Sequence, residues 1–539
     1  MPKKTYIPKS IIDLDGWGTD EWDYANRFAY THRLDSPTPI KMFLGLAWAR
    51  KTSTKWELIK PSHEALLVPY IVETIDDFKE KLRLRIEEIN EKIMVATAEK
   101  NALELDRLNR ELEIFEKITP KRRNNNLITN IKKLAASVPG GNVDYHEVDK
   151  VDPDRPETIY TINTPNGLID LRTGRYIETP QDLYITKCTA VAPSPNHQYH
   201  SDKWQKTVEA ILPDRAVRRY MQKVLGMALI AKKTDDLFIV CQGSGGNGKT
   251  TLLNTVATAL GADYVSNITS KSLMDSYKSM SGGGVATPDI ADLRGKRLAL
   301  LSETKENDYF DTGIIKLLSG GGIIRARYLR QNPIEFIATH LIILDTNYIP
   351  RLKNVADKAF RSRLVIIPFT QVFDRHNNTL KTDLLKKEVL EDVLLWLIEG
   401  ARLYLEEGLE SGKNLPKAMQ DMLAKYYDDN DAIHAFILDR CVQDRKQVVS
   451  LKDLYSAYAE WHRDEYGGVN KDSNRTMSAK LRAQVCWDQV RDAEGGFNYV
   501  KSPDNTPYNP VVKRYNHGNM VLGLRLKTYE ERNITIRRN

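Results

Sequence analysis

The chain has 539 residues, which is more than one hydrophobic core normally serves, so about three or four domains are expected. Hydrophobic residues make up 41% and charged residues 28%, and no segment approaches the roughly 18 consecutive apolar residues of a membrane span. The net charge of +7 permits a polyanionic partner without requiring one. Composition therefore excludes a membrane protein and leaves the function to be inferred from motifs.

The N-terminal segment and the cysteines indicate the cellular compartment that the sequence predicts. The N-terminal segment has no apolar core followed by a small-residue cleavage site, so no export signal is recognised. Cys188, Cys241, Cys441 and Cys486 are far apart and form neither a C-x-x-C pair nor a zinc pattern. We expect reduced, structural thiols in a cytosolic protein.

Residues 1–124 are expected to form a mostly helical domain. From Thr74 to Ile118 the sequence has neither Gly nor Pro, and apolar residues recur at three- and four-residue steps. A helical hairpin or bundle fits this pattern better than a coiled coil, because Pro120 ends the segment after only a few heptads. Near that end, Lys121, Arg122 and Arg123 form a basic cluster.

The rest of the chain divides by pattern into four parts. Residues 125–233 mix turns, short strands and a helical end, and are expected to link two domains. Residues 234–370 contain four buried-strand runs separated by helical stretches, which predicts a parallel α/β sheet. Amphipathic helices follow over 371–445, and residues 446–539 have a helix-turn-helix pattern. The expected fold class is therefore multidomain α/β and α.

The strongest motif is a glycine-rich loop between a strand and a helix. The sequence GSGGNGKT at 243–250 satisfies G-x-x-x-x-G-K-[ST] in the required setting. Backbone N–H groups of such a loop cradle phosphates, its lysine contacts the β- and γ-phosphates, and its hydroxyl binds Mg²⁺. The motif predicts an ATP and Mg²⁺ site. Its expected nucleotide-binding residues are Gly243, Gly245, Gly246, Asn247, Gly248, Lys249, Thr250 and Thr251.

A nucleoside triphosphatase also needs an acidic residue at the end of a neighbouring strand. The strand expected at 297–301 is followed by Glu303, which we assign as the catalytic acid and, with Thr250, as a metal-site residue. The strand at 340–344 ends in Asp345, which is the alternative acid. An edge carboxylate without a catalytic role is the simpler interpretation of Glu303.

A basic hairpin is expected between these two strands. The glycines at 320–322 lead into a strand carrying Arg325, Arg327 and Tyr328, followed by a turn near residues 329–332 that holds Arg330 and by a return strand at 334–338. Arginines bind phosphates and a tyrosine stacks on a base, so these four residues are predicted to bind DNA. A solvent-exposed or subunit-packing hairpin is the alternative.

Two arginines before the last strand of the α/β region are candidates for transition-state stabilisation. A guanidinium supplied across a subunit interface neutralises charge on the γ-phosphate. Arg363 is the first choice and Arg361 the second, and either is alternatively a surface residue or half of a salt bridge.

Together these residues resemble the phage and plasmid primase-helicase family, which includes poxvirus-type relatives and belongs to the superfamily 3 helicases with an AAA+ core. The resemblance covers roughly residues 125–370. Four segments beyond the phosphate loop carry it: TPNGLIDLRTG at 164–174, YMQKVLGMAL at 220–229, DLRGKR at 292–297 and KLLSGG at 316–321. Gly322 departs from the family pattern, where an acid usually follows the last of these segments.

The resemblance implies an ATP-dependent DNA helicase that moves on single-stranded DNA as a hexameric ring during replication of a mobile element. It assigns Asn347 as the γ-phosphate sensor and residues 446–539 to a winged helix that binds duplex or forked DNA or a partner such as a separate primase or polymerase. Two alternatives remain, a primase-helicase and a DNA-binding ATP switch without motor activity. Asp13 and Asp15 imitate the acidic pair of a primase, but we interpret them as surface or helix-capping residues.

Overall fold

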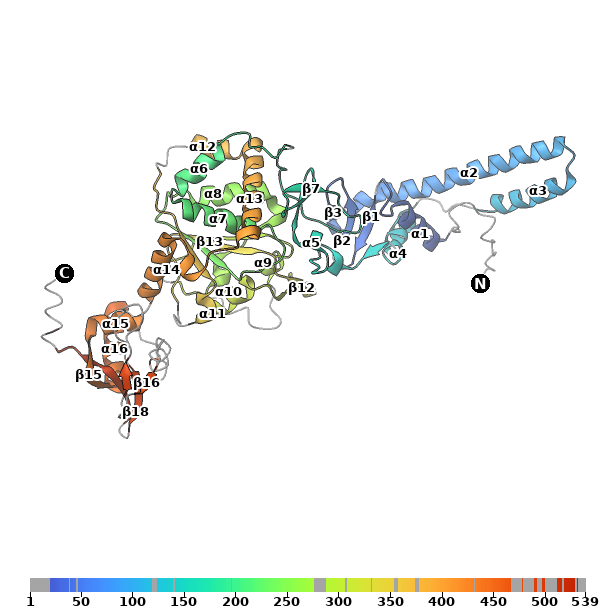
Figure 1. The fold of residues 1–539 in the computed structure, drawn as a ribbon. Coiled ribbons are helices and arrows are strands. Elements are labelled where there is room, and N and C mark those ends of the chain that lie inside the picture. Colours follow the sequence, from blue (N-terminus) through green and yellow to red (C-terminus); the bar gives the residue numbers. More distant parts are fainter. Residues whose placement is uncertain are drawn as a thin grey trace.

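The computed structural model is elongated, with a central α/β module between an N-terminal and a C-terminal module (Figure 1). The residues that it describes are 20–37, 39–44, 47–118, 124–138, 141–194, 196–275, 287–305, 308–330, 332–352, 357–373, 378–430, 432–466, 477, 489–491, 497–499, 511–515, 518–528 and 531. The acidic pair at Asp13 and Asp15, the basic cluster at 121–123 and Cys486 lie outside these residues.

The N-terminal module combines helices with a small sheet. Its elements are α1 (Glu21–Thr31), β1 (Ile40–Phe43), β2 (Ala47–Lys51), β3 (Trp56–Ile59), α2 (Val68–Ala98), α3 (Ala102–Glu116), α4 (Asn125–Ala135) and β4 (Asn142–Val143). The sheet has the order β3-β2-β1-β4. A mostly helical domain was therefore an incomplete prediction, because strands of two to five residues leave little alternation to recognise.

Helices α2 and α3 form the predicted helical hairpin, which projects from the module (Figure 1). The base of α2 packs into one core with α1 and α4, through residues that include Tyr24, Phe78 and Ile131. Strand β4 pairs in parallel with β1. The division expected at 124/125 falls inside this core, because α4 and β4 bury their apolar residues against elements that precede it.

The segment predicted to link two domains, residues 125–233, divides between different parts of the fold. Its first part contains α5 (Pro156–Ile159) and the antiparallel sheet of β5 (Thr161–Thr164), β6 (Gly167–Asp170) and β7 (Arg175–Ile177). Its second part, α6 (Lys203–Ile211) and α7 (Arg215–Met227), joins the core of the central module through Trp204, Tyr220 and Val224. The expected division at 233/234 therefore cuts through one continuous hydrophobic core.

The central module is built on the predicted parallel sheet. Its strands are β8 (Phe238–Gln242), β9 (Val265–Asn267), β10 (Leu298–Ser302), β13 (Leu341–Thr346) and β14 (Leu364–Pro368). All pairings are parallel, in the order β14-β8-β13-β10-β9. Because side chains alternate along a strand, Ile239 and Ile343 face one core while Val240 and Leu344 face another.

Helices cover both faces of this sheet (Figure 1). The core that contains Ile239 also contains residues of α8 (Lys249–Tyr264) and α13 (Lys387–Glu407), together with α6 and α7. The core that contains Val240 is completed by α9 (Pro288–Ala291), α10 (Thr312–Ser319), α11 (Lys358–Arg361) and α14 (Lys417–Asn430). Helix α12 (Asn378–Leu384) adds Leu384 to the first core. Helices α12, α13 and α14, which follow residue 371, thus belong to the cores of this module.

The C-terminal module begins earlier than residue 446. Its described elements are α15 (Ala432–Arg440), β15 (Cys441–Ser450), α16 (Leu451–Tyr466), β16 (Gln489–Arg491), β17 (Phe497–Tyr499), β18 (Val511–Tyr515) and β19 (Gly518–Leu526). Phe436 of α15 is buried with Leu454, Tyr458 and Leu524, so α15 belongs to this core. One sheet has the order β15-β19-β18, and β16 pairs with β17.

The helices and the cysteines can be compared with the expectations for membrane spans and thiols. Within the described residues, no helix is both long and apolar enough to cross a membrane. Cys188 and Cys241 are free thiols. Burial raises the pKa of the Cys241 thiol, which keeps it protonated and unreactive inside the sheet.

Candidate nucleotide and nucleic-acid site

The glycine-rich loop lies at the carboxyl end of β8 and leads directly into α8. Three of its glycines, Gly245, Gly246 and Gly248, have φ values of 105°, 66° and 80°, which L side chains rarely adopt. Gly248 caps α8, so the first unpaired N–H groups of that helix face the loop. An anion is stabilised at such a helix terminus. The loop therefore has the backbone shape that its motif predicts.

Lys249 is held inside this loop. Its side chain is only 5% exposed, and Nζ donates to the Gly243 carbonyl at 3.0 Å and to Oδ1 of Asn347 at 3.0 Å. Burial lowers the pKa of its ammonium, while nearby Asp345 acts in the opposite direction. The lysine and the predicted sensor thus meet at one point, where a terminal phosphate can take the place of the Asn347 amide oxygen.

Asp345 is the carboxylate nearest to the loop. The hydroxyl of Thr250 donates to its Oδ2 at 2.6 Å, and its Oδ1 lies 4.0 Å from Lys249 Nζ. Strand β13, which carries Asp345, lies between β8 and β10. Our expectation that the strand before Glu303 neighbours the loop strand is therefore wrong, since one strand separates them. The order follows from parallel crossovers, which need not join sequential neighbours.

Glu303 follows β10 at the same edge of the sheet. Its side chain is exposed and no described residue bonds to its carboxylate, whereas its backbone carbonyl accepts from Ser270 Oγ at 2.7 Å. Its φ is +63°, in the left-handed region. A non-glycine residue held there costs about 1–3 kcal/mol and occurs most often at functional sites. Glu303 is thus a free carboxylate on strained backbone, one strand further from the loop than Asp345.

Residues 369–373, which follow β14, form hydrogen bonds with the glycine-rich loop. The sequence motifs did not predict this contact. Asn247 is 2% exposed, and its amide donates to the Gln371 carbonyl at 2.6 Å and accepts from Gly245 N at 2.7 Å. The N–H of Phe373 donates to the Gly246 carbonyl at 2.9 Å. Among these residues, the polar Asn247 within the loop was the one sequence feature that could have indicated the contact. The carbonyls that it and Phe373 bind belong to the backbone, and every residue has one. Thr251 is half-buried in the first turn of α8.

The predicted basic hairpin is present as β11 (Ile323–Ala326) and β12 (Ile334–Ile337). Alternate residues face solvent, so Arg325 lies on the exposed face opposite Glu335, with 3.9 Å between Nε and Oε1. Arg330 is exposed at the turn with a φ of +59°. Arg327 is half-buried and its backbone pairs with Thr287. Arg325 and Arg330 are thus open to a polyanion.

Tyr328 does not fit the predicted stacking role. Its hydroxyl donates to Oδ1 of Asp292 at 2.9 Å, and its ring packs against the core that contains Val240. Burial and this hydrogen bond raise the pKa of its hydroxyl. The exposed apolar side chain at the turn is instead Leu329, which is 72% exposed. The prediction failed because Asp292, the partner of Tyr328, is 36 residues away in the sequence.

The two candidate arginines lie at the opposite edge of the sheet from the loop. Arg363 directly precedes β14, whose residues 364–368 pair with 238–242, so about 16 Å of strand separates it from the loop. It forms an ion pair with Asp236 at 2.6 Å. The guanidinium of Arg361 lies 4.1 Å from the ring centre of Tyr427. Neither arginine is therefore placed to reach a nucleotide on its own loop.

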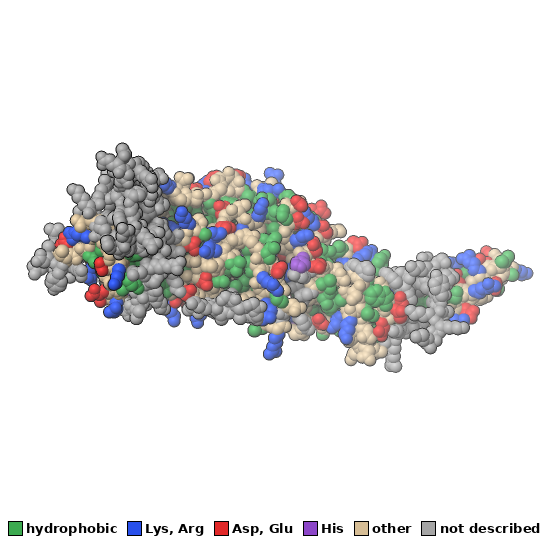
Figure 2. All heavy atoms as spheres, turned by 90° about the horizontal axis from the view of Figure 1, so that it is seen from below, with side chains coloured by type: hydrophobic (Ala, Val, Ile, Leu, Met, Phe, Trp, Pro, Cys, Tyr) green, Lys and Arg blue, Asp and Glu red, His purple; other side chains and the backbone are tan. Residues whose placement is uncertain are grey.

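Charge is mixed over the face drawn in Figure 2, where Lys and Arg side chains are interspersed with Asp and Glu. This agrees with the modest net charge and leaves nucleic-acid binding to local features such as the hairpin.

The fold is a multidomain α/β structure in which a glycine-rich loop joins β8 to α8 at the edge of a parallel sheet. Residues 25–213 match the family model described as D5 N terminal like. The chain is 29% identical over 341 residues, 58% of its length, to the "Putative helicase" of Acanthamoeba polyphaga mimivirus, and covers 34% of that protein. It is 24% identical over 297 residues, 50% of its length, to the "Putative primase" of African swine fever virus, and covers 30% of that protein.

These matches show similarity to a primase-helicase family with viral members, in agreement with the family resemblance predicted from the motifs. The chain spans about a third of the length of these relatives. A solved structure, titled the apo structure of NrS-1 C terminal region, aligns over 94% of this chain and 99% of its own with a TM-score of 0.43 and 12% identity.

Proposed function

We propose that this protein is an ATP-hydrolysing DNA helicase that moves along single-stranded DNA as a hexameric ring, in the replication of a phage, plasmid or genomic island in the host cytoplasm. The observation that carries the proposal is the convergence of Lys249, Thr250, Asp345 and Asn347 at one edge of a parallel sheet that also supports a basic hairpin. Relatives named helicase and primase support the same class of activity.

The cofactor is ATP with Mg²⁺. Lys249 and Thr250 are the first two residues of α8, whose N-terminus attracts the phosphates. Lys249 binds the terminal phosphates, and the Thr250 hydroxyl binds the Mg²⁺ that accompanies them. Asp345 orients the Thr250 hydroxyl through their hydrogen bond. Glu303, whose carboxylate has no bond to another described residue, orients the attacking water, and Asn347 senses the γ-phosphate.

The hairpin of β11 and β12 grips single-stranded DNA. It is inserted between β10, which leads to Glu303, and β13, which leads to Asn347, so movement at the nucleotide is passed to the hairpin through its two connections. Arg325 and Arg330 contact phosphates, and Leu329 contacts bases. The C-terminal module is proposed as a winged helix that binds duplex or forked DNA or a separate primase or polymerase.

A strand-displacement assay on a tailed duplex tests the proposal. The full chain is expected to separate the strands when ATP and Mg²⁺ are present. Lys249→Ala is expected to abolish displacement, and Lys206→Ala is the matched control, because Lys206 is an exposed lysine paired with Asp202 on α6. Nucleotide hydrolysis without displacement by the unaltered chain would favour an ATP switch over a motor.

A second candidate is a primase-helicase, favoured by the relatives named primase. Primer synthesis needs paired carboxylates that hold metal ions, and no group of three or more His, Cys, Asp or Glu suited to a metal occurs among the described residues. A ribonucleotide primer-synthesis assay decides this point, and a primer that persists in Lys249→Ala would place priming outside the P-loop site.

A further inference from the structure

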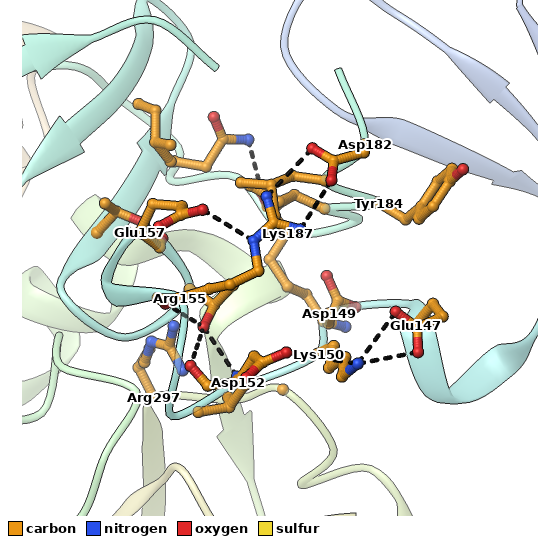
Figure 3. A pocket seen from close by; sticks show the side chains of 18 of the residues that line it. Glu147, Asp149, Lys150, Asp152, Arg155, Glu157, Asp182, Tyr184, Lys187 and Arg297 are labelled. Carbon is orange, nitrogen blue, oxygen red and sulfur yellow. Dashed lines mark hydrogen bonds and ion pairs between the residues drawn. The ribbon is translucent and has the colours of Figure 1, made fainter. Parts of the chain in front are cut away.

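A pocket lies at the edge of the central sheet opposite the glycine-rich loop, where the linking segment meets the central module (Figure 3). Its volume is about 70 Å³. Residues 147–187 form one wall, and Tyr264, Gly295 and Arg297 form the other. Because a water molecule needs roughly 10–15 Å³, the space holds a group of about five heavy atoms, which is the size of a phosphate.

Arg297 is a buried cation in this wall that forms no ion pair with a described residue. The residue is 8% exposed, its Nε is buried without a hydrogen bond, and no described carboxylate lies within ion-pair distance. Its guanidinium lies 5.7 Å from the ring centre of Tyr264. Burial lowers the pKa of the group, but an arginine remains charged in a protein. A buried charge without an ion pair is costly, so an anion that binds beside Arg297 would lower this cost.

Lys187 adds a second unpaired cation. It lines the same pocket from the linking segment, and no described carboxylate pairs with its ammonium. Its Cε lies against Gly295, where a Cβ would approach to 3.1 Å. Burial, and secondarily the charge of Lys187, lower the pKa of neighbouring Lys296 to about 8, while Asp263, Asp292 and Asp149 act in the opposite direction.

The carboxylates of the pocket are already satisfied by the protein. Arg155 pairs with both Glu157 and Asp182, as the dashed lines in Figure 3 show. Lys150 pairs with Glu147 at 3.0 Å and Asp152 at 3.5 Å. Asp149 accepts from the N–H of Thr186 at 2.7 Å and from its hydroxyl. Among the described residues that line the pocket, Arg297 and Lys187 are the cations without an ion pair, and Asp149 is the carboxylate whose charge acts on Arg297.

We propose that this pocket binds one tetrahedral phosphoryl group, either free phosphate or the terminal phosphate of a small nucleotide, between Arg297 and Lys187. The bound group joins the linking segment to the central module, since one cation comes from each side. The site is separate from the glycine-rich loop, because Arg297 precedes β10 and about 16 Å of that strand lies between it and the carboxyl edge.

Isothermal titration calorimetry on the full chain tests the proposal, in a Lys249→Ala background that weakens phosphate binding at the loop. Inorganic phosphate is titrated in one arm and ADP in the other, at matched ionic strength. Saturable binding of phosphate is expected, weakened about tenfold or more by Arg297→Met and also weakened by Lys187→Met. Arg175→Met is the control, because Arg175 is an exposed cation of β7 outside the pocket.

Thermal unfolding without added phosphate gives an independent measurement. Replacing an unpaired buried arginine by methionine keeps the volume and removes the uncompensated charge, so Arg297→Met is expected to melt at the same or a higher temperature. Phosphate is expected to raise the melting temperature of the parent and not of Arg297→Met. Binding of ADP alone that depends on Arg297 would assign the site to a nucleotide. Binding of neither ligand, or equal binding by Arg297→Met, would overturn the proposal.

Discussion

The hydroxyl of Thr250 donates to Oδ2 of Asp345 at 2.6 Å, which ties the first turn of α8 to the strand beside the glycine-rich loop. Glu303 stands one strand further away with its carboxylate unbonded. The two acids therefore have different tasks. In the proposed function, Asp345 orients the Thr250 hydroxyl that would bind Mg²⁺, and Glu303 orients the attacking water.

Substitution separates these tasks. Lys249→Ala is expected to weaken both ATP binding and turnover. Asp345→Asn is expected to raise the Mg²⁺ concentration needed for ATP binding, because the Thr250 hydroxyl loses its charged acceptor. Glu303→Gln is expected to bind ATP normally and to lose turnover by about 10²-fold or more. Fluorescent-nucleotide binding and steady-state phosphate release measure both properties, and normal turnover in Glu303→Gln would transfer the acid role to Asp345.

The hairpin of β11 and β12 is predicted to bind single-stranded DNA through its arginines and not through Tyr328. Replacing Arg325, Arg327 and Arg330 by alanine is expected to weaken single-strand binding. Each arginine that binds a phosphate contributes about one unit, or a little less, to the slope of the salt dependence, so the slope is expected to flatten accordingly. Tyr328→Phe is expected to leave DNA binding unchanged and to cost about 1 kcal/mol of stability, because it removes the bond to Asp292. Unchanged salt dependence in the triple variant would show that the arginines of the hairpin do not bind the phosphates of single-stranded DNA.

Several elements could be predicted from the sequence because their signals are local. Strands buried on both faces appear as continuous apolar runs, so the runs at 237–240 and 340–344 predict β8 and β13, and the glycine-rich loop carries its own pattern. The order of the strands is not local, since crossovers placed β13 between β8 and β10. The partners of Tyr328 and Asn247 are distant in sequence or are backbone carbonyls, and neither leaves a pattern.

Gly248 predicts a specific double-substitution result. A Cβ at this position would lie 2.7 Å from Cγ1 of Ile211, and the residue has a φ of +80°. Gly248→Ala is therefore expected to lose ATP binding and stability. Adding Ile211→Ala relieves the clash but leaves the backbone strain of roughly 1–2 kcal/mol, so only partial recovery is expected relative to Ile211→Ala alone. ATP binding restored to the level of Ile211→Ala would show that the left-handed φ is not required.

Lys233 gives the stability a pH dependence. Its Nζ donates to the carbonyls of Leu318 and Ser319 at the end of α10, and burial lowers its pKa to about 7. The unfolded chain keeps this proton up to about pH 10.5, so between pH 7 and pH 10.5 it binds more protons than the folded protein. Stability relative to Lys233→Met is therefore expected to increase with pH across this window. Melting temperatures from pH 6 to pH 10 measure it, and parallel curves for the two proteins would contradict it.

The last prediction concerns Arg363, which pairs with Asp236 at the sheet edge away from its own loop. A ring is built from head-to-tail interfaces, so the nucleotide of one subunit faces a surface of the next, and an arginine that cannot act within its own subunit can act there. Glu303→Gln and Arg363→Ala proteins are each expected to be inactive. Mixing them creates some junctions with an intact Glu303 and an intact Arg363, so hydrolysis is expected to reappear. Arginine fingers contribute about 10³- to 10⁵-fold in rate, so even a minority of restored junctions gives a measurable signal.

The control for that mixture is Asp236→Asn, which removes the ion-pair partner of Arg363 and leaves the arginine intact. It is expected to remain active alone, because the role assigned to Arg363 requires the guanidinium and not its resting partner. Steady-state hydrolysis is measured on co-assembled proteins, with light scattering to establish that mixed rings have formed. If mixed rings form and no ratio restores hydrolysis, Arg363 does not act across the interface. Arg361, which stacks on Tyr427 at the same edge, would then be tested by the same mixture.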